Sequence, residues 1–299
     1  MPLDPIARIR RFNRAVTQEA GALEQSYLGR GRPLGVARVL CAIAPEGTDL
    51  AALRAALGLD SGLLSRTLRG LEDEGLVTLA ADPADARRRR AALTPEGLAE
   101  VAAYDALSDA RASAILRGLG RDGAAMLDAM DRIAVVLGRA RISVARIDPA
   151  DPRAAAARGH YYAELSGRFG TVFAPGPDTP AVLDDLRPPR GSFLIAACDG
   201  LDIGCVGLRP DGTTPDGAPQ GEVKRLWVAG AARGLGLARR LMTAIEDEAR
   251  LLGMAALRLD TNATLTEALA LYRSSGWHEI ARYNDNPHAQ HWFAKALAP

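Results

Sequence analysis

A glycine-rich turn between a strand and a helix is the clearest chemical motif of this chain. The apolar segment VKRLWV ends at residue 228, and AGAARGLGLARRL follows it directly. Because glycine lacks a Cβ atom, backbone N–H groups of such a turn can converge on a phosphate at the helix N-terminus. No lysine follows as in a GxxxxGK loop, and Arg239 stands where a dinucleotide-binding turn needs glycine or alanine. Glycine-rich turns also occur for steric reasons alone, so this motif is weak evidence by itself.

A second motif narrows the choice of phosphate ligand. The segment LRLDTNATLTEALALYRSSGWHEI predicts a strand that ends at Asp260, a helix that carries Leu271 and Tyr272, and then Gly276 and Trp277. Together the two motifs resemble the GNAT acetyltransferase superfamily, with its phosphate-binding turn and its LYxxxGF helix, in which Trp277 fills the aromatic position. The resemblance covers residues 141–299 and implies a mixed α/β GNAT fold with acetyl-CoA as cofactor.

The resemblance also implies which residues contact the cofactor. Backbone groups of the turn would hold the diphosphate, and the end of the preceding strand would line the pantetheine arm. The N–H of Val228 would polarise the thioester carbonyl, and Asn262 would lie beside the cofactor arm. The residues are Arg233, Gly234, Gly236, Leu237 and Ala238 in the turn, and Leu226, Trp227 and Val228 in the strand.

Direct attack of an amine on a thioester requires two proton movements, because the amine loses a proton and the departing thiolate gains one. Tyr272 matches the general-acid position of the GNAT superfamily, and Glu222 is our candidate base, directly or through water. Two plainer interpretations stay open: Tyr272 as a core aromatic residue and Glu222 as a solubilising charge at a strand edge. We expect the acceptor to enter beside His160, Tyr161, Tyr162 and Asn284.

The first half of the chain carries a pattern that suits DNA. From residue 48 the sequence predicts a helix, a tight turn and a second helix. Steps of 100° per residue place Leu64, Leu68 and Leu71 on one face of the second helix. The opposite arc, which is small, polar and basic, can approach a major groove and present hydrogen-bonding groups. It carries Ser61, Ser65, Arg66 and Arg69.

A predicted β-hairpin follows this helix pair. The segment VTLAADPADARRRRAALT reads as two strands joined by a turn that carries Arg87, Arg88, Arg89 and Arg90. Arginine at the tip of such a wing contacts phosphates or the minor groove. The alternative is a solvated basic turn beside an ordinary amphipathic helix pair, since charge runs usually face solvent. The position of the run directly after the helix pair favours DNA binding.

The order of these elements resembles the MarR family of winged-helix regulators. The resemblance is carried by LEDEGLVTL, by Asp85-Ala86-Arg87 and by Leu93-Thr94-Pro95-Glu96-Gly97. It covers residues 1–140 and implies a homodimer, built from the first and the last two helices, that reads a pseudo-palindromic operator in double-stranded DNA. We therefore predict two domains: a mainly α winged helix-turn-helix domain for DNA binding and dimerisation over 1–140, and a GNAT acetyltransferase domain over 141–299.

Apolar periodicity sets the expected element bounds. In the first half it predicts helices over 5–27, 33–44, 49–57, 61–74, 95–118 and 121–138. In the second half it predicts a helix that carries His160, strands over 192–198, 203–209, 222–228, 255–260, 277–283 and 289–296, and helices over 236–252 and 264–275.

Composition excludes several classes of protein. The 299 residues are 48% hydrophobic and 24% charged, which is typical of globular domains, and no apolar stretch has the length of a membrane span. The N-terminus lacks the apolar core of a secretory signal, so we expect a cytoplasmic protein. The net charge of +1 requires any DNA contact to come from local arginines. The three cysteines have no metal-binding spacing, and His288 and His291 lack further ligands nearby, so we expect no metal site.

Three functions remain open at this point. The chain could be a bifunctional regulator that binds DNA and N-acetylates a small amine or a protein lysine. It could be a regulator whose GNAT half only senses acetyl-CoA or an amine ligand. It could also be an enzyme that uses the winged-helix half only for dimerisation or protein docking. Tyr272 and Glu222 favour the first function over the second, and the arginines of residues 87–90 favour it over the third.

Overall fold

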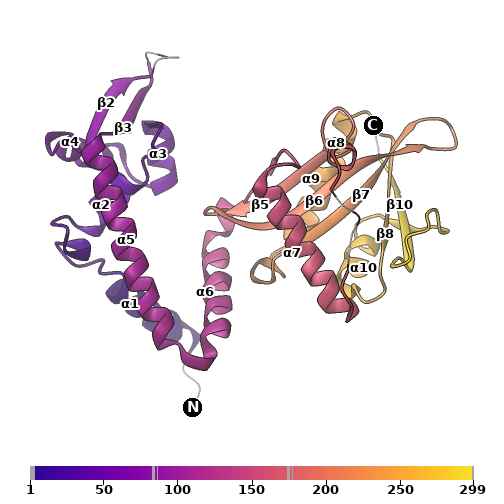
Figure 1. Ribbon diagram of the computed structural model, residues 1–299, viewed down its shortest axis with the longest axis horizontal. Coiled ribbons are helices and arrows are strands. Elements are labelled where there is room, and N and C mark those ends of the chain that lie inside the picture. Colours follow the sequence, from indigo (N-terminus) through magenta and orange to yellow (C-terminus); the bar gives the residue numbers. More distant parts are fainter. Residues whose placement is uncertain (1–3, 83–84, 86, 174–175, 177, 298–299) are drawn as a thin grey trace. The chain divides into compact units, whose positions relative to one another are not determined.

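The structure is a computed structural model that describes residues 4–82, 85, 87–173, 176 and 178–297. The chain divides into two compact units, Met1–Arg121 and Asp122–Pro299 (Figure 1). Among the described residues, no helix is both long enough and apolar enough to cross a bilayer.

The first unit is mainly helical and has a small antiparallel sheet of strand order β1-β3-β2 in its described part. This confirms the predicted winged-helix class. The predicted helix over 5–27 ends early, because Gly21 takes a left-handed φ of 62° that ends a helix. The elements are α1 (Pro5–Glu19), η1 (Tyr27–Gly29), α2 (Leu34–Cys41), β1 (Thr48–Asp49), α3 (Leu50–Leu57), α4 (Ser61–Asp73), β2 (Val77–Ala81), β3 (Arg89–Leu93), α5 (Pro95–Gly118) and η2 (Gly120–Asp122).

Short acidic side chains begin the two helices of the helix-turn-helix. The Asp49 carboxylate accepts hydrogen bonds from the N–H groups of Ala51 and Ala52 at the start of α3. The Asp60 carboxylate accepts one from Leu63 N–H at the start of α4. These bonds satisfy N–H groups that have no partner inside a helix. The apolar faces of both helices then enter one core, which contains Ala37, Val39, Leu40, Ile43, Leu53, Leu64, Leu68, Leu71, Leu76, Val77, Ala91 and Tyr104.

The segment over residues 93–97 fixes the hairpin to α5 through close backbone contact. The Thr94 N–H donates to the Leu76 carbonyl over 3.0 Å, and the Thr94 hydroxyl accepts from the Gly97 N–H over 3.0 Å. A Cβ atom at Gly97 would lie 1.9 Å from the Leu76 carbonyl oxygen, so only glycine fits there without a backbone shift. The base of the hairpin is therefore held at one defined position.

The second unit has one mixed sheet, and this confirms the predicted α/β class. Within the described residues its strand order is β4-β5-β6-β7-β8-β10-β9, and all neighbours are antiparallel except β7 and β8. The strands are β4 (Ser143–Arg146), β5 (Ser192–Cys198), β6 (Leu201–Thr213), β7 (Pro219–Val228), β8 (Ala256–Thr261), β9 (His278–Glu279) and β10 (His291–Ala296). The helices are α6 (Gly123–Gly138), η3 (Arg139–Arg141), α7 (Pro152–Phe169), α8 (Pro180–Asp184), η4 (Gly230–Ala232), α9 (Leu237–Leu251) and α10 (Thr266–Arg273).

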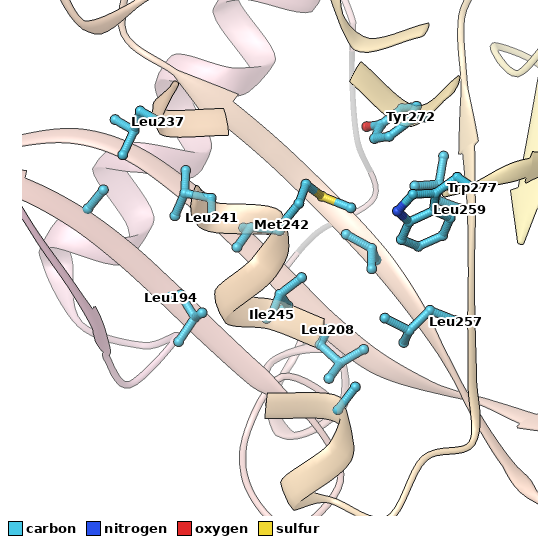
Figure 2. Packing of buried hydrophobic residues seen from close by; sticks show 14 of the residues in the cluster. Leu194, Leu208, Leu237, Leu241, Met242, Ile245, Leu257, Leu259, Tyr272 and Trp277 are labelled. Carbon is cyan, nitrogen blue, oxygen red and sulfur yellow. The ribbon is translucent and has the colours of Figure 1, made fainter. Parts of the chain in front are cut away.

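Helices cover both faces of this sheet. Leu194 and Ala196 of β5 belong to the apolar cluster that also contains the buried side of α9, whereas Phe193 and Ile195 belong to a second cluster with α7. The two sets alternate along β5, as the pleat of a strand requires. Figure 2 shows the first cluster, in which the α9 side chains lie against Leu194, Leu208, Leu257 and Leu259 and near Tyr272 and Trp277.

Helix α6 belongs to the second unit, whereas the sequence predicts a boundary near residue 140. Val135 is 1% exposed and lies in the same apolar cluster as α9. A Cβ atom at Gly138 would lie 2.6 Å from the Cys198 sulfur, so the end of α6 packs closely on β5. The periodic pattern of α6 does not reveal which domain buries it, because a helix can bury the same stripe against either neighbour.

Candidate functional site

Strand β7 has a β-bulge in its pairing with β6, at the place where the sheet is open between β7 and β8. Cys205 of β6 pairs with Trp227, and Gly207 pairs with Lys224, so Arg225 and Leu226 face a single residue of β6. Arg225 takes a left-handed φ of 57°, which is uncommon for a residue with a side chain. The parallel pairing of β7 with β8 spans only residues 220–222 of β7. After Glu222 no further pair joins the two strands in the described residues, so the segment of β7 that carries the bulge borders a gap in the sheet.

The backbone N–H of Val228 faces this gap. The N–H of the next residue, Ala229, donates to the Ile203 carbonyl of β6 over 2.9 Å. Successive N–H groups of a strand point to opposite edges, so the Val228 N–H points away from β6 and toward β8. This orientation suits the predicted contact of that N–H with a thioester carbonyl.

The glycine turn leads from β7 into α9. Gly234 and Gly236 both have left-handed φ values, of 74° and 78°, which suit glycine best. A Cβ atom at Gly236 would meet nothing within 4 Å, so the space beside the turn is open. The first N–H groups of α9 have no carbonyl partner inside the helix, and the helix dipole makes this end positive. The open turn and these donors fit a diphosphate group.

A groove follows the turn along the gap between β7 and β8, and we call it the turn groove. It brings together all predicted cofactor residues except Asn262. Its walls also include Arg168, which is paired with Glu164 and Glu267 of the same walls, and Arg239, whose guanidinium group adds positive charge near the turn. The lining residues are Tyr161, Glu164, Leu165, Arg168, Leu226, Trp227, Val228, Ala232, Arg233, Gly234, Gly236, Leu237, Ala238, Arg239, Leu265, Glu267, Ala268 and Leu271.

The side chain of Arg233 folds back over the strand end. Its Nε donates to the Val228 carbonyl over 3.1 Å, and its guanidinium pairs with Glu164 of α7. Arg168 pairs with Glu164 over 3.0 Å and with Glu267 over 2.9 Å. These ion pairs connect α7 to the turn and to α10. The walls of the turn groove are therefore tied to each other across the gap.

A second cavity adjoins the turn groove, and we call it the aromatic cavity. It shares Tyr161, Leu165, Leu226, Leu265 and Ala268 with the groove, so the two lie side by side. Its wall holds a cluster of rings: Phe169 stacks on His288 with centroids 5.6 Å apart, and the tilted ring of Phe173 lies 5.0 Å from that of His288. Charged groups of Lys224, Arg225, Arg209 and Asp260 also line it.

The structure separates the predicted acceptor residues into two groups. Tyr161 and Tyr162 line the aromatic cavity, and the Tyr162 hydroxyl accepts a hydrogen bond from Arg225 Nε over 2.8 Å. His160 is exposed and stacks on the Trp227 ring, with centroids 5.2 Å apart. Asn284 does not line the cavity. Its amide donates to Asp260, which does, and its side-chain oxygen accepts from Trp292.

Tyr272 lies between the core and the aromatic cavity. Its ring lies beside Trp277 (Figure 2), with centroids 6.1 Å apart. It also packs against Phe293 over 5.6 Å, and Tyr272 is 6% exposed. The same residue lines the aromatic cavity. Burial, with a smaller contribution from the charge of Asp260, raises the pKa of Tyr272 above its ordinary value. The hydroxyl therefore keeps its proton at neutral pH and can donate it.

Glu222 is a poor proton acceptor in this structure. It is fully buried, and its carboxylate pairs with Arg209 and with Lys224 and accepts a hydrogen bond from the Tyr283 hydroxyl over 2.7 Å. Burial alone would raise the pKa of Glu222, but Lys224, Arg209 and Tyr283 outweigh burial and lower it. The sequence does not predict this outcome, because Arg209 and Tyr283 come from other parts of the chain. A carboxylate held in this way orients its neighbours rather than exchanging protons.

Lys224 joins Glu222 to the end of β8. Its Nζ lies 2.9 Å from a Glu222 oxygen and 3.1 Å from an Asp260 oxygen. Burial would raise the pKa of Asp260, but Lys224 and the amides of Asn284 and Asn286 outweigh burial and lower it. Both carboxylates thus remain ionised, and they hold Lys224 at the wall of the aromatic cavity.

Asn262 lines the aromatic cavity rather than the turn groove. Its amide donates to the His288 carbonyl over 2.7 Å, and its side-chain oxygen accepts from Thr264 N–H over 2.9 Å. These bonds connect the loop after β8 to the segment that carries His288. Asn262 therefore shapes the wall of the aromatic cavity, and its contact with the cofactor arm stays a prediction.

In the first unit, the two faces of α4 are as predicted. Leu64, Leu68 and Leu71 are buried in the core. The opposite face is free of core contacts and presents small polar and basic side chains to solvent. Ser61, Ser65, Arg66 and Arg69 are all exposed.

The arginines of the hairpin divide into two groups. Arg87, Arg88 and Arg89 are exposed. Arg90 instead donates to the carbonyls of Glu46 and Gly47, over 2.9 Å and 2.8 Å, and so joins β3 to the loop before β1. Ala86 lies outside the described residues. Arg90 therefore holds the hairpin in place, and the three exposed arginines are the ones that can reach a phosphate.

Sequence reasoning missed several residues of these sites. Arg132 of α6 contacts the glycine turn, and Lys224 and Arg225 line the aromatic cavity. Arg132 carries no local signal, because it belongs to a helix far from the turn in sequence. Lys224 and Arg225 stand inside the motif itself, and the bulge at Arg225 is the feature that brings their side chains to the cavity.

Two family models match the chain. The model of the acetyltransferase (GNAT) family matches residues 160–277, and the model of the MarR family matches residues 30–88. The first covers the second half of α7, the turn groove and α10, and the second covers the helix-turn-helix and the start of the hairpin.

Two relatives of known name are also acetyltransferases. An IAA acetyltransferase of Azospirillum brasilense is 38% identical over 38% of this chain and 72% of its own length. An N-acetyltransferase of Schizosaccharomyces pombe is 38% identical over 33% of this chain and 60% of its own length. A solved acetyltransferase from Salmonella typhimurium with its cofactor acetyl-CoA is 17% identical, with a TM-score of 0.41 over 53% of this chain and 95% of that one.

Proposed function

Because the chain belongs to the GNAT acetyltransferase family and carries a MarR-family domain, we propose that it is a bifunctional cytoplasmic regulator that binds operator DNA and N-acetylates a primary amine. The acceptor would be a small amine or a protein lysine. The observation that carries this proposal is that the turn groove and the aromatic cavity adjoin each other, with Tyr161, Leu165, Leu226, Leu265 and Ala268 lining both. One site can hold a donor and the other an acceptor, so that their reacting atoms meet.

The turn groove supplies the donor site. GNAT acetyltransferases use acetyl-CoA, which when bound supplies an acetyl group as a reactive thioester. The N–H groups of Gly234, Gly236 and the first turn of α9 would hold the diphosphate. Leu226 and Trp227 would line the pantetheine arm, and the Val228 N–H would donate to the thioester carbonyl and favour attack on it.

The aromatic cavity supplies the acceptor site and the acid. Tyr272, whose hydroxyl is protonated at neutral pH and lines this cavity, would donate its proton to the departing sulfur as negative charge develops there. Tyr161 and Tyr162 would position the amine, and His160 would support the Trp227 ring from outside. Glu222 and Asn284 would act by holding Lys224 and Asp260, rather than by removing the proton of the amine. The amine would then lose its proton to water, and water would return a proton to Tyr272 after the thiol leaves.

The first unit supplies the DNA site. The exposed face of α4 would enter a major groove with Ser61, Ser65, Arg66 and Arg69, and Arg87, Arg88 and Arg89 would contact the adjacent backbone. A homodimer would cover the large apolar side chains that are exposed on α1, α5 and α6. These include Ile6, Ile9, Phe12, Val16, Leu107, Ile115, Leu116, Met126, Met130, Ile133 and Leu137.

One observation favours a second function, in which the GNAT unit only senses acetyl-CoA or an amine. Glu222, the predicted base, is sequestered by Arg209, Lys224 and Tyr283, so it is not free to take a proton from an acceptor. A site without a base would bind both ligands and turn over slowly.

A thiol-release assay separates the two functions. The full chain is mixed with acetyl-CoA and a panel of amino acids, polyamines, aminoglycosides and lysine peptides, and free thiol is measured over time. We expect at least one class to release thiol faster than the amine-free control. Saturable binding of acetyl-CoA without thiol release for any class would select the sensor function instead.

A further inference from the structure

Helix α6 reaches the glycine turn through one arginine. The Arg132 guanidinium donates hydrogen bonds to the carbonyl of Ala231, over 2.9 Å, and to the carbonyl of Arg233. Its second terminal nitrogen lies 3.9 Å from the position that a Cβ atom at Gly234 would occupy. A single side chain from outside the motif thus holds two carbonyls of the turn.

These two hydrogen bonds orient the N–H groups of the turn. In a trans peptide the carbonyl and the following N–H point in opposite directions. The bond to the Arg233 carbonyl therefore turns the Gly234 N–H away from α6. The bond to the Ala231 carbonyl turns the Ala232 N–H in the same way, but that N–H donates to the Ala229 carbonyl over 2.8 Å, so of the two it is the Gly234 N–H that can bind a phosphate. Because Gly234 has wide backbone freedom, an external clamp has a large effect on how often this peptide adopts that orientation.

The position of Arg132 is itself fixed by packing. Three residues further along α6, Val135 is 1% exposed in the core of the second unit, and Gly138 approaches the Cys198 sulfur closely. The other face of α6 exposes Met126, Met130, Ile133 and Leu137. The helix is thus anchored to the sheet on one side and is available to a partner on the other.

We propose that Arg132 is a positioning residue for the diphosphate turn, and that coenzyme binding and the stability of α6 are linked through it. The inference rests on the proposed function, because it requires that the turn groove binds coenzyme A. Linkage is reciprocal: if α6 favours the turn conformation that binds the diphosphate, then bound coenzyme stabilises α6 by the same free energy. Since α6 also carries part of the proposed dimer surface, the donor would influence the regulator half.

Two donors of different length test the positioning role. Acetyl-CoA contains the diphosphate, whereas S-acetylpantetheine ends before it. For Arg132→Ala we expect the KM of acetyl-CoA to rise about tenfold, with kcat little changed, because hydrogen bonds from a charged group are lost only at the diphosphate turn. The KM of S-acetylpantetheine should stay within about twofold of the wild-type value. Arg132→Lys keeps the charge and a hydrogen-bond donor, so its KM for acetyl-CoA should lie between the wild-type value and that of Arg132→Ala.

Arg139→Ala is the matched control, because Arg139 is exposed, directly follows α6 and carries the same charge. Its KM for both donors should equal the wild-type value. An equal rise of both KM values in Arg132→Ala, or no rise in either, would overturn the positioning role. If the alanine variant fails to fold, the same comparison of the two KM values is made with Arg132→Lys.

Hydrogen exchange tests the linkage. In the wild-type chain, saturating coenzyme A should slow amide exchange within Gly123–Gly138, and in Arg132→Ala this protection should be lost. Unchanged exchange in α6 of the wild-type chain, although coenzyme A binds, would overturn the linkage. If the wild-type chain binds no coenzyme A in a calorimetric titration, the proposed function itself fails, and that result is distinct from the other two.

Discussion

Replacing Tyr272 by phenylalanine is expected to lower kcat roughly 10²- to 10³-fold, which is the usual loss when a positioned acid is removed. The ring would still pack against Phe293 and Trp277, so the fold and the donor site should be retained. The KM of acetyl-CoA should change less than about twofold, since the binding groups are in the turn groove. Steady-state kinetics of thiol release with the best acceptor measure both values.

Tyr104→Phe is the matched control for this variant. Tyr104 lies in the first unit, is 2% exposed and has a hydroxyl without a hydrogen-bond partner among the described residues. Its removal should leave acetyl transfer unchanged. Because the pKa of Tyr272 is raised, the wild-type rate should not fall through loss of this proton as the pH rises from neutral to mildly alkaline. A Tyr272→Phe enzyme with wild-type kcat would remove Tyr272 from the role of acid.

The double variant Arg87→Ala/Arg88→Ala is expected to weaken DNA binding by about 10- to 100-fold at moderate salt. Both side chains are exposed at the hairpin, and a dimer would lose each of them twice. Each lost phosphate contact should also reduce the slope of log K against log salt by about 0.9. Mobility shifts with sheared genomic DNA at several salt concentrations measure both effects without knowledge of the operator.

A control with the same change in charge is Arg139→Ala/Arg240→Ala, since both residues are exposed in the second unit. This control should bind DNA like the wild-type chain. Acetyl transfer by Arg87→Ala/Arg88→Ala should also be normal, which shows that the second unit folds, and an unchanged far-UV circular dichroism spectrum of the full chain shows that the helical first unit folds as well. Wild-type affinity and salt slope in the hairpin variant would mean that these arginines face solvent and contact no DNA.

Much of the fold could be predicted from local sequence signals. Caps such as Asp49, Asp60 and Thr94 mark helix starts, and the leucine spacing of α4 gives its buried face. Such features depend on residues a few positions apart, so a single sequence contains them. The domain to which α6 belongs depends on contacts with Cys198 and the glycine turn, far away in sequence. That is why the sequence places the boundary near residue 140 and the structure places it after Arg121.

The candidate site residues also divide into those that a local motif predicts and those whose role depends on residues far away in the sequence. Eight of the predicted cofactor residues lie on one groove, because a single strand–turn–helix motif carries them all. Glu222 and Arg90 show the limit of this approach. Each has the right residue type at a suitable place, but Arg209 and Tyr283 bind the first, and the carbonyls of Glu46 and Gly47 bind the second. These partners are brought together only by the folded sheet.

Calorimetric titration of coenzyme A into the full chain is the most direct test of the donor site. We expect saturable heat with one coenzyme per chain, and its loss in Gly236→Val, because valine disfavours the left-handed backbone of the turn. Gly253→Val is the control, since Gly253 has a similar φ of 74° beyond the other end of α9, away from the groove. If the wild-type chain gives no binding heat, or Gly236→Val binds as tightly as Gly253→Val, the assignment of the turn as a diphosphate site is contradicted.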